Sequence, residues 1–149
     1  MSVAGVVVGS EKIVIVEGTK NLDGTVTLVK DEVFTLEKGD RHIAYGAMHK
    51  RITDRMSHGI AEVILKASSA GKFTGTQGAL LAAELRGVFI SAVPSAIAVK
   101  QEHVKNLSKA GSRKVGDYTK DEVWWNEHFA GDVRKGNREA AYLILGAED

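Results

Sequence analysis

The sequence predicts a single α/β domain built on a mixed five-stranded sheet with helices on both faces. The first 40 residues alternate β-branched segments with two short turns, which is typical of consecutive antiparallel strands. After residue 40, apolar residues recur at helical spacing between short apolar segments, which indicates right-handed crossovers. No linker or internal repeat divides the 149 residues, so one domain over residues 1–149 is expected.

Three strands are predicted before residue 30. Val3–Val8 and Lys12–Val16 are rich in β-branched residues, and Gly9-Ser10-Glu11 between them is a hairpin signal. A second turn at residues 21–24 precedes the alternating segment 25–29. Because both turns are short, neighbouring strands must run antiparallel.

A helix follows the third strand. Asp40 is a suitable N-cap residue, because its carboxylate can accept from free backbone N–H groups of the first turn. Ala44, Met48, Ile52 and Met56 then recur every four residues and form one apolar face. The pattern predicts a helix that packs on the sheet through this face.

Two crossovers are predicted in the middle of the chain. Residues 61–67 read as a strand buried on both faces, and Thr76–Arg86 as a second helix. Val88–Val93 is expected to form the fifth strand, ended by Pro94, after which Ser95 caps a third helix. The residues expected to point inward from these two helices are Leu80, Leu81, Leu85, Ile97, Val104 and Leu107.

The last third of the chain predicts a loop and two helices. Residues 109–118 lose apolar content and gain two glycines, which favours a mobile basic loop. Residues 119–122 read as a capping box that opens a helix over Val123–Phe129. Trp124 and Trp125 are adjacent on that helix, so one is expected to pack inward and the other to lie at the rim, as a possible protein contact. A final helix is predicted from about Asn137, with Ala140, Ala141, Leu143 and Ile144.

Charge is unevenly distributed. The net charge is −3 over residues 1–40, +4 over 41–98, +4 over 99–120 and −4 over 121–149. A basic middle between acidic ends favours an anion-binding face. Cysteine is absent, which fits a reducing compartment, so a cytoplasmic location is expected. No apolar run approaches the ~18 residues that a membrane span needs, so no membrane partner is expected.

The predicted element order, together with three short motifs, resembles the ribonuclease H-like fold and its RuvC-type branch, the Holliday junction resolvases. Gly5–Ser10 is similar to the first strand and turn of that family, and Asn137–Leu143 to its terminal helix. Thr76–Glu84 resembles a small-residue helix of the family, and Val99-Lys100-Gln101 its "VKQ" step. Gly71-Lys72-Phe73 and the surrounding loop resemble a compact bacterial family of uncharacterised function on the same fold.

The resemblance also implies which positions carry catalysis. RuvC-type nucleases hold two Mg²⁺ ions with four carboxylates, because hard cations need oxygen ligands. The first-strand aspartate corresponds here to Val7, and the fourth-strand glutamate falls near Leu65 or Lys66. Of the terminal pair, the first falls at Gly136 and the second matches Glu139. An intact two-metal site is therefore not expected, and a Lys66 ammonium would replace the ion electrostatically.

Three functions follow from these residues. The first is a non-catalytic RuvC-like domain without a cofactor that binds DNA, RNA or a protein partner. Its predicted nucleic-acid contacts are Lys66, Lys72, Lys100, Lys105, Arg113 and Lys114. The alternative is a Mg²⁺-dependent nuclease on structured DNA, with a rearranged site drawn from Glu62, Asp117, Asp132 and Glu139. The third is a structural or regulatory homodimer that pairs through the Met- and Ala-rich first helix.

Overall fold

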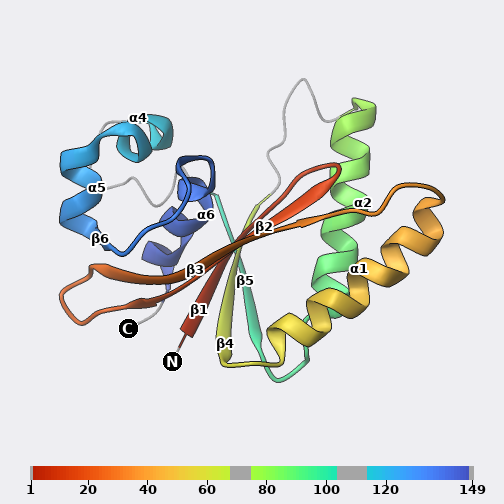
Figure 1. The fold of residues 1–149 in the computed structure, drawn as a ribbon, viewed down its shortest axis with the longest axis horizontal. Helices are drawn as coiled ribbons and strands as arrows, with labels where there is room; N and C mark the ends of the chain where they lie inside the picture. Colours follow the sequence, from red (N-terminus) through yellow and green to blue (C-terminus); the bar gives the residue numbers. More distant parts are fainter. Residues whose placement is uncertain (1, 68–74, 104–113, 148–149) are drawn as a thin grey trace.

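The computed structural model describes residues 2–67, 75–103 and 114–147 (Figure 1). Within this part of the chain, six strands form one mixed sheet in the order β5-β4-β1-β2-β3-β6. The strands are β1 (Ser2–Val8), β2 (Lys12–Lys20), β3 (Val26–Thr35), β4 (Ile60–Lys66), β5 (Ala98–Glu102) and β6 (Phe129–Ala130). The helices are α1 (Arg41–Met56), α2 (Gln77–Ala92), α4 (Val115–Lys120), α5 (Glu122–His128) and α6 (Arg138–Leu143), with short 3₁₀ turns η1 (Lys135–Asn137) and η2 (Ile144–Gly146).

The predicted position of β1 is confirmed. It lies inside the sheet, antiparallel to β2 and parallel to β4, with Val7 opposite Val14 and Val6 opposite Leu65. The first helix also begins as predicted, since the Asp40 side chain accepts a hydrogen bond from the His42 N–H at 2.9 Å. The α/β class and the mixed sheet with helices on both faces are confirmed, with one strand more than predicted.

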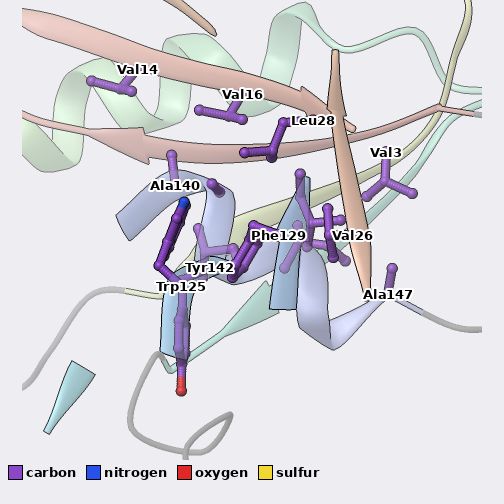
Figure 2. Packing of buried hydrophobic residues seen from close by; sticks show 14 of the residues in the cluster. Val3, Val14, Val16, Val26, Leu28, Trp125, Phe129, Ala140, Tyr142 and Ala147 are labelled. Atoms are coloured by element: carbon purple, nitrogen blue, oxygen red, sulfur yellow. The ribbon is translucent and has the colours of Figure 1, made fainter. Parts of the chain in front are cut away.

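Helices cover the two faces of the sheet in two groups (Figure 1). α1 and α2 pack on one face, against strand residues such as Val6, Ile15 and Leu65. α4, α5 and α6 pack on the other, and Figure 2 shows Trp125, Phe129 and Tyr142 beneath Val14 and Val16. Side chains alternate across each strand, so both faces are apolar and both are covered. In the described part of the chain no helix combines the length and apolarity that crossing a membrane requires.

The predicted fifth strand over residues 88–93 is wrong. Residues 77–92 form the single helix α2, capped by the Thr76 hydroxyl, which accepts from the Ala79 N–H at 3.1 Å. Leu85, Phe89 and Ala92 are buried at helical spacing. The unbroken apolar run over residues 88–93 fits a strand as well as a helix, so the sequence pattern does not distinguish the two. Thr76 and Leu85 thus belong to the predicted helix, but Leu80 is exposed.

The strand that pairs with β4 is instead β5, which lies where the third helix was predicted. Ile97 donates its N–H to the Pro94 carbonyl at 3.0 Å, so a turn follows α2 and Ser95 caps no helix. Val99 then packs into the α1–α2 core from β5. Val104 and Leu107 lie outside the described residues.

The C-terminal third also differs from expectation. Part of the predicted loop is helical, because Tyr118 is buried and its ring lies tilted against that of Trp124, with ring centroids 4.7 Å apart, which fixes α4. The next helix is capped by Asp121 and not by Thr119, since Asp121 Oδ1 accepts from the N–H groups of Val123 and Trp124. Trp125 is buried and Trp124 half-buried, as the adjacent pair predicted. Residues 109–113 lie outside the described part.

Candidate functional site

α6 lies directly on the backbone of β1. A Cβ atom built on Gly5 would lie 1.9 Å from the Ala140 carbonyl oxygen, far inside van der Waals contact. Only glycine permits this approach, because a side chain at position 5 would occupy the space of the helix backbone. The contact places the first turn of α6 over the middle of β1.

Val7, Lys66 and Glu139 are brought together by this packing. Val6 and Leu65 are register partners and both face the α1–α2 core, so the next residues of each strand, Val7 and Lys66, face α6. Lys66 forms an ion pair with Glu139, which lies in the first turn of α6. Three of the positions that the resemblance indicated therefore meet at one place, where they present one apolar side chain, one ammonium and one carboxylate.

β5 adds a second ion pair beside the first. Lys66 is the register partner of Glu102, and Ile64 is the partner of Lys100. Lys100 and Glu102 are two residues apart on one face of the strand, with Nζ 3.5 Å from Oε1. Lys100 Nζ also donates to the Gly146 carbonyl at 3.1 Å. We call these four residues the lysine–glutamate cluster: Lys66, Lys100, Glu102 and Glu139.

The other predicted acidic residues do not join this cluster. Glu62 is the register partner of Val3 and Ala98, so it lies four residues before Lys66, about 13 Å along β4. Asp117 lies in α4, and Asp132 follows β6. No group of three or more histidine, aspartate or glutamate side chains that could hold a metal ion occurs within residues 2–67, 75–103 and 114–147.

The residues present do not fit a two-magnesium centre. Two Mg²⁺ ions bridged in a nuclease need several carboxylate oxygens directed at one point. The Val7 side chain offers no ligand atom, and the carboxylate of Glu139 already pairs with the Lys66 ammonium. Glu139 is the one carboxylate that the resemblance retains, and its charge is already balanced by Lys66.

Of the six predicted basic contacts, Lys66 and Lys100 belong to the cluster, on the same face of the adjacent strands β4 and β5 and offset by two residues. Lys114 is exposed and occupies the position that precedes α4, where its side chain makes no capping hydrogen bond. Lys72, Lys105 and Arg113 lie outside the described residues.

Sequence reasoning missed Glu102 and Arg86. Glu102 is two residues after Lys100, and this spacing places both side chains on one face only in a strand, whereas a helix was predicted there. Arg86 donates from Nε to the Lys66 carbonyl at 3.3 Å and from Nη2 to Gln101 Oε1 at 2.5 Å, which ties α2 to the ends of β4 and β5. Burial lowers the pKa of Arg86 from its ordinary value.

The helix that carries Glu139 is anchored at its start by Asp31 of β3. Asp31 Oδ2 accepts from the Arg134 N–H at 3.1 Å and from Asn137 Nδ2 at 2.8 Å. Burial alone would raise the pKa of Asp31, but the hydrogen bonds from Arg134 and Asn137 and the charge of Arg134 outweigh it and lower this pKa. The charged form of Asp31 therefore stabilises the native position of residues 134–137.

We expect this anchor to make stability depend on pH below about 4. Because the folded pKa of Asp31 lies below its ordinary value of 3.8, its contribution is present above that value and is lost as pH falls through the folded pKa. The unfolding free energies of the wild type and Asp31→Asn, measured by urea titration from pH 7 to pH 2, should therefore converge as pH falls. A difference that stays constant over this range would contradict the assignment.

Arg138 joins α6 to the α4–α5 pair. Its guanidinium donates to both Glu122 carboxylate oxygens, at 2.9 and 3.1 Å, and to the Thr119 carbonyl at 2.8 Å. It also lies over the Trp125 ring, 4.7 Å from the centroid. The hydrogen bond from Arg138 is the main reason that the pKa of Glu122 is lowered. These contacts orient the residue that precedes Glu139.

The topology and the meeting of β1, β4 and α6 define a ribonuclease H-like fold of the RuvC type. The structure of RuvC from Thermus thermophilus is similar to this chain with a TM-score of 0.75, at 15% identity, over 97% of this chain and 91% of that one. T. thermophilus RuvC in complex with Holliday junction substrate gives a TM-score of 0.73 at 14% identity, over 97% and 90% of the two chains. The yeast mitochondrial Holliday junction resolvase Ydc2 gives 0.68 at 9% identity, over 96% and 75%.

At these low identities the structural similarity establishes the fold alone. No protein-family model matches the chain, and no curated protein matches it in sequence.

Proposed function

We propose that this chain is a RuvC-like domain that binds nucleic acid without cleaving it. The observation that carries the proposal is the Lys66–Glu139 ion pair beside Val7. It stands on a fold that is similar to T. thermophilus RuvC in complex with Holliday junction substrate. The chain has the fold of a nuclease, and lysine side chains bind its ligand in place of metal ions.

The physical argument concerns charge. Phosphodiester groups are attracted by any cation that can approach their oxygens, and lysine ammonium groups are the common donors. Lys66 and Lys100 lie on adjacent strands of the α6 face, with 36% and 39% of their side chains exposed. Cleavage needs more than attraction, because the attacking and leaving oxygens must both be stabilised. Among the described residues beside Val7, Lys66 and Glu139 supply one ammonium and one carboxylate and no such pair of groups.

Binding should be tested against salt. We expect four-way branched DNA, duplex DNA or single-stranded RNA to bind, with log K falling linearly as log salt rises between about 50 and 200 mM. Arg113→Ala with Lys114→Ala should weaken binding and reduce the slope by about 1–2, because each lost phosphate contact removes about 0.7–0.9. Fluorescence anisotropy at several salt concentrations provides both quantities.

Lys38→Ala with Lys50→Ala is the matched control. It removes the same net charge, but Lys38 precedes α1 and Lys50 is exposed on α1, on the opposite face of the sheet from α6. Its slope should equal that of the wild type. Equal losses in both double variants would show that overall charge, and not residues 113 and 114, determines binding. No binding to any DNA or RNA at low salt would overturn the proposal in favour of a protein partner, for which Trp124 is the first residue to truncate.

The nuclease alternative rests on the retained Glu139. We expect no cleavage of branched or duplex DNA above a buffer control with either Mg²⁺ or Mn²⁺, and no heat of metal binding in a calorimetric titration. Cleavage that is abolished by Glu139→Gln would establish the nuclease instead. If the domain is non-catalytic, the wild type and Glu139→Gln should both show no cleavage.

Self-association is the remaining candidate. The Met- and Ala-rich face of α1, which suggested a homodimer, is packed on the sheet, since Ala44, Met48 and Met56 are at most 2% exposed. The helices instead expose Ile43 on α1 and Leu80 on α2, at 65% and 56%. Pairing through α1 or α2 would use exposed apolar residues such as these, and sedimentation of Ile43→Asp and Leu80→Asp variants tests it.

A further inference from the structure

The lysine–glutamate cluster is electrically balanced within itself. Its two ammonium groups face two carboxylates, with Lys66 paired to Glu139 and Lys100 to Glu102. The pairs come from different elements, since Glu139 belongs to α6 and Glu102 to β5. Glu102 is in addition the register partner of Lys66, so it lies between the two lysines on the same face. A nucleic-acid phosphate that approaches either lysine meets a carboxylate already in place.

The cluster is nevertheless open to solvent. The side chains of Lys66, Lys100 and Glu139 are 36%, 39% and 41% exposed, and that of Glu102 is 20% exposed. Ion pairs at such exposure are weak, because water screens the attraction and holding two long side chains in one geometry costs entropy. A phosphate oxygen is an acceptor of the same kind as a carboxylate oxygen, so it can take the place of one.

Lys100 is prepared for such an exchange. One of its three N–H donors is used by the Gly146 carbonyl, which holds the ammonium near the end of η2 whether or not the carboxylate is bound. Val7 adds no competing acceptor beside Lys66. The carboxylates are therefore the groups in the cluster that a phosphate has to displace.

We propose that Glu139 and Glu102 compete with nucleic-acid phosphates for Lys66 and Lys100, so that the cluster is a phosphate contact restrained by its own carboxylates. This inference rests on the proposed function and adds a regulatory role for the two glutamates. It assigns to Glu139 a role opposite to that of a metal ligand, since removing its charge strengthens binding.

The first measurement is the affinity of Glu139→Gln for the nucleic acid that the wild type binds. Glutamine keeps the size of the side chain and removes the charge, so binding should tighten by about threefold to tenfold at low salt. The slope of log K against log salt should become steeper by about 0.7–0.9, because Lys66 is then available to one more phosphate. Glu102→Gln should act in the same direction. Glu62→Gln is the control, because Glu62 lies on the same face of β4 near its other end, and it should leave both quantities unchanged.

A double-mutant cycle isolates the mechanism. Lys66→Gln should weaken binding in the wild type, because it leaves Glu139 as an unpaired negative charge beside the phosphate, and it should cancel the gain in the Glu139→Gln background. Weaker or unchanged binding by Glu139→Gln, in a variant with the circular dichroism and melting temperature of a folded protein, would overturn the inference while leaving the proposed function intact. A wild type that binds no nucleic acid would overturn both.

Discussion

Replacing Gly5 by alanine is expected to destabilise the protein by at least about 3 kcal/mol. The added Cβ would lie 1.9 Å from the Ala140 carbonyl oxygen and 3.0 Å from its carbonyl carbon, so the clash is with backbone and no side-chain rotation relieves it. α6 would have to move away from β1 by more than 1 Å. That movement would separate the buried residues Ala141 and Leu143 from the sheet and leave cavities.

Gly46→Ala is the matched control for this change. Gly46 lies within α1, and a Cβ atom there meets nothing within 4 Å. Because alanine restricts the unfolded chain more than glycine does, this variant should be stabilised by roughly 0.5–1 kcal/mol. Urea titration followed by circular dichroism measures both free energies of unfolding. A Gly5→Ala variant as stable as the wild type would mean that α6 does not rest on β1 as described.

Much of the fold could be predicted because its local signals are strong. The turn at residues 9–11 and the β-branched segments on each side specify the β1–β2 hairpin, in which Val8 is opposite Ile13. Asp40 and the four-residue spacing from Ala44 to Met56 specify α1. In both cases the sequence fits the period of only one kind of element, the strand for β1 and β2 and the helix for α1. Tertiary contacts were therefore not needed to decide between strand and helix.

The middle of the chain could not be predicted for the converse reason. Val88-Phe89-Ile90 is apolar at every position, so it fits a buried strand as well as a helix buried on one side. The decision lies in long-range packing, since Phe89 is buried between α2 and the sheet, whereas Ile90 is 36% exposed. Because the fifth strand was predicted at residues 88–93, a helix was predicted where β5 lies. The shared face of Lys100 and Glu102 on β5 was therefore not predicted.

The candidate site was predicted in part. The resemblance indicated Val7, Lys66 and Glu139, and the register of β1 with β4 and the position of α6 bring these residues together. Nothing in the sequence indicated that Gly5 admits a helix backbone, because a glycine in a strand is more often a bulge or a weak point. The ion pair between Lys66 and Glu139 joins residues 73 positions apart, and only tertiary structure reveals it.

Phe89→Ala is expected to cost about 3–5 kcal/mol of stability. Phe89 is fully buried in the core between α1, α2 and the sheet, together with Leu85 and Ile52. Truncation removes most of a large apolar side chain and leaves a cavity whose walls, a helix and a sheet, cannot collapse fully. The adjacent Ile90 serves as the control, because Ile90→Ala removes a partly exposed side chain and should cost less than about 1 kcal/mol.

The two variants also distinguish the helix from the strand that the sequence favoured. In a strand buried on both faces, Phe89 and Ile90 would point to opposite buried faces, and truncating either would cost several kcal/mol. In α2 the two side chains point about 100° apart, so only one reaches the core. Comparable losses at both positions would therefore contradict the helix. Phe89 lies on the face of the sheet opposite α6, so the folded fraction of Phe89→Ala should bind nucleic acid with the wild-type salt slope. The loss of stability in Phe89→Ala can therefore be separated from the loss of phosphate contacts in Arg113→Ala/Lys114→Ala.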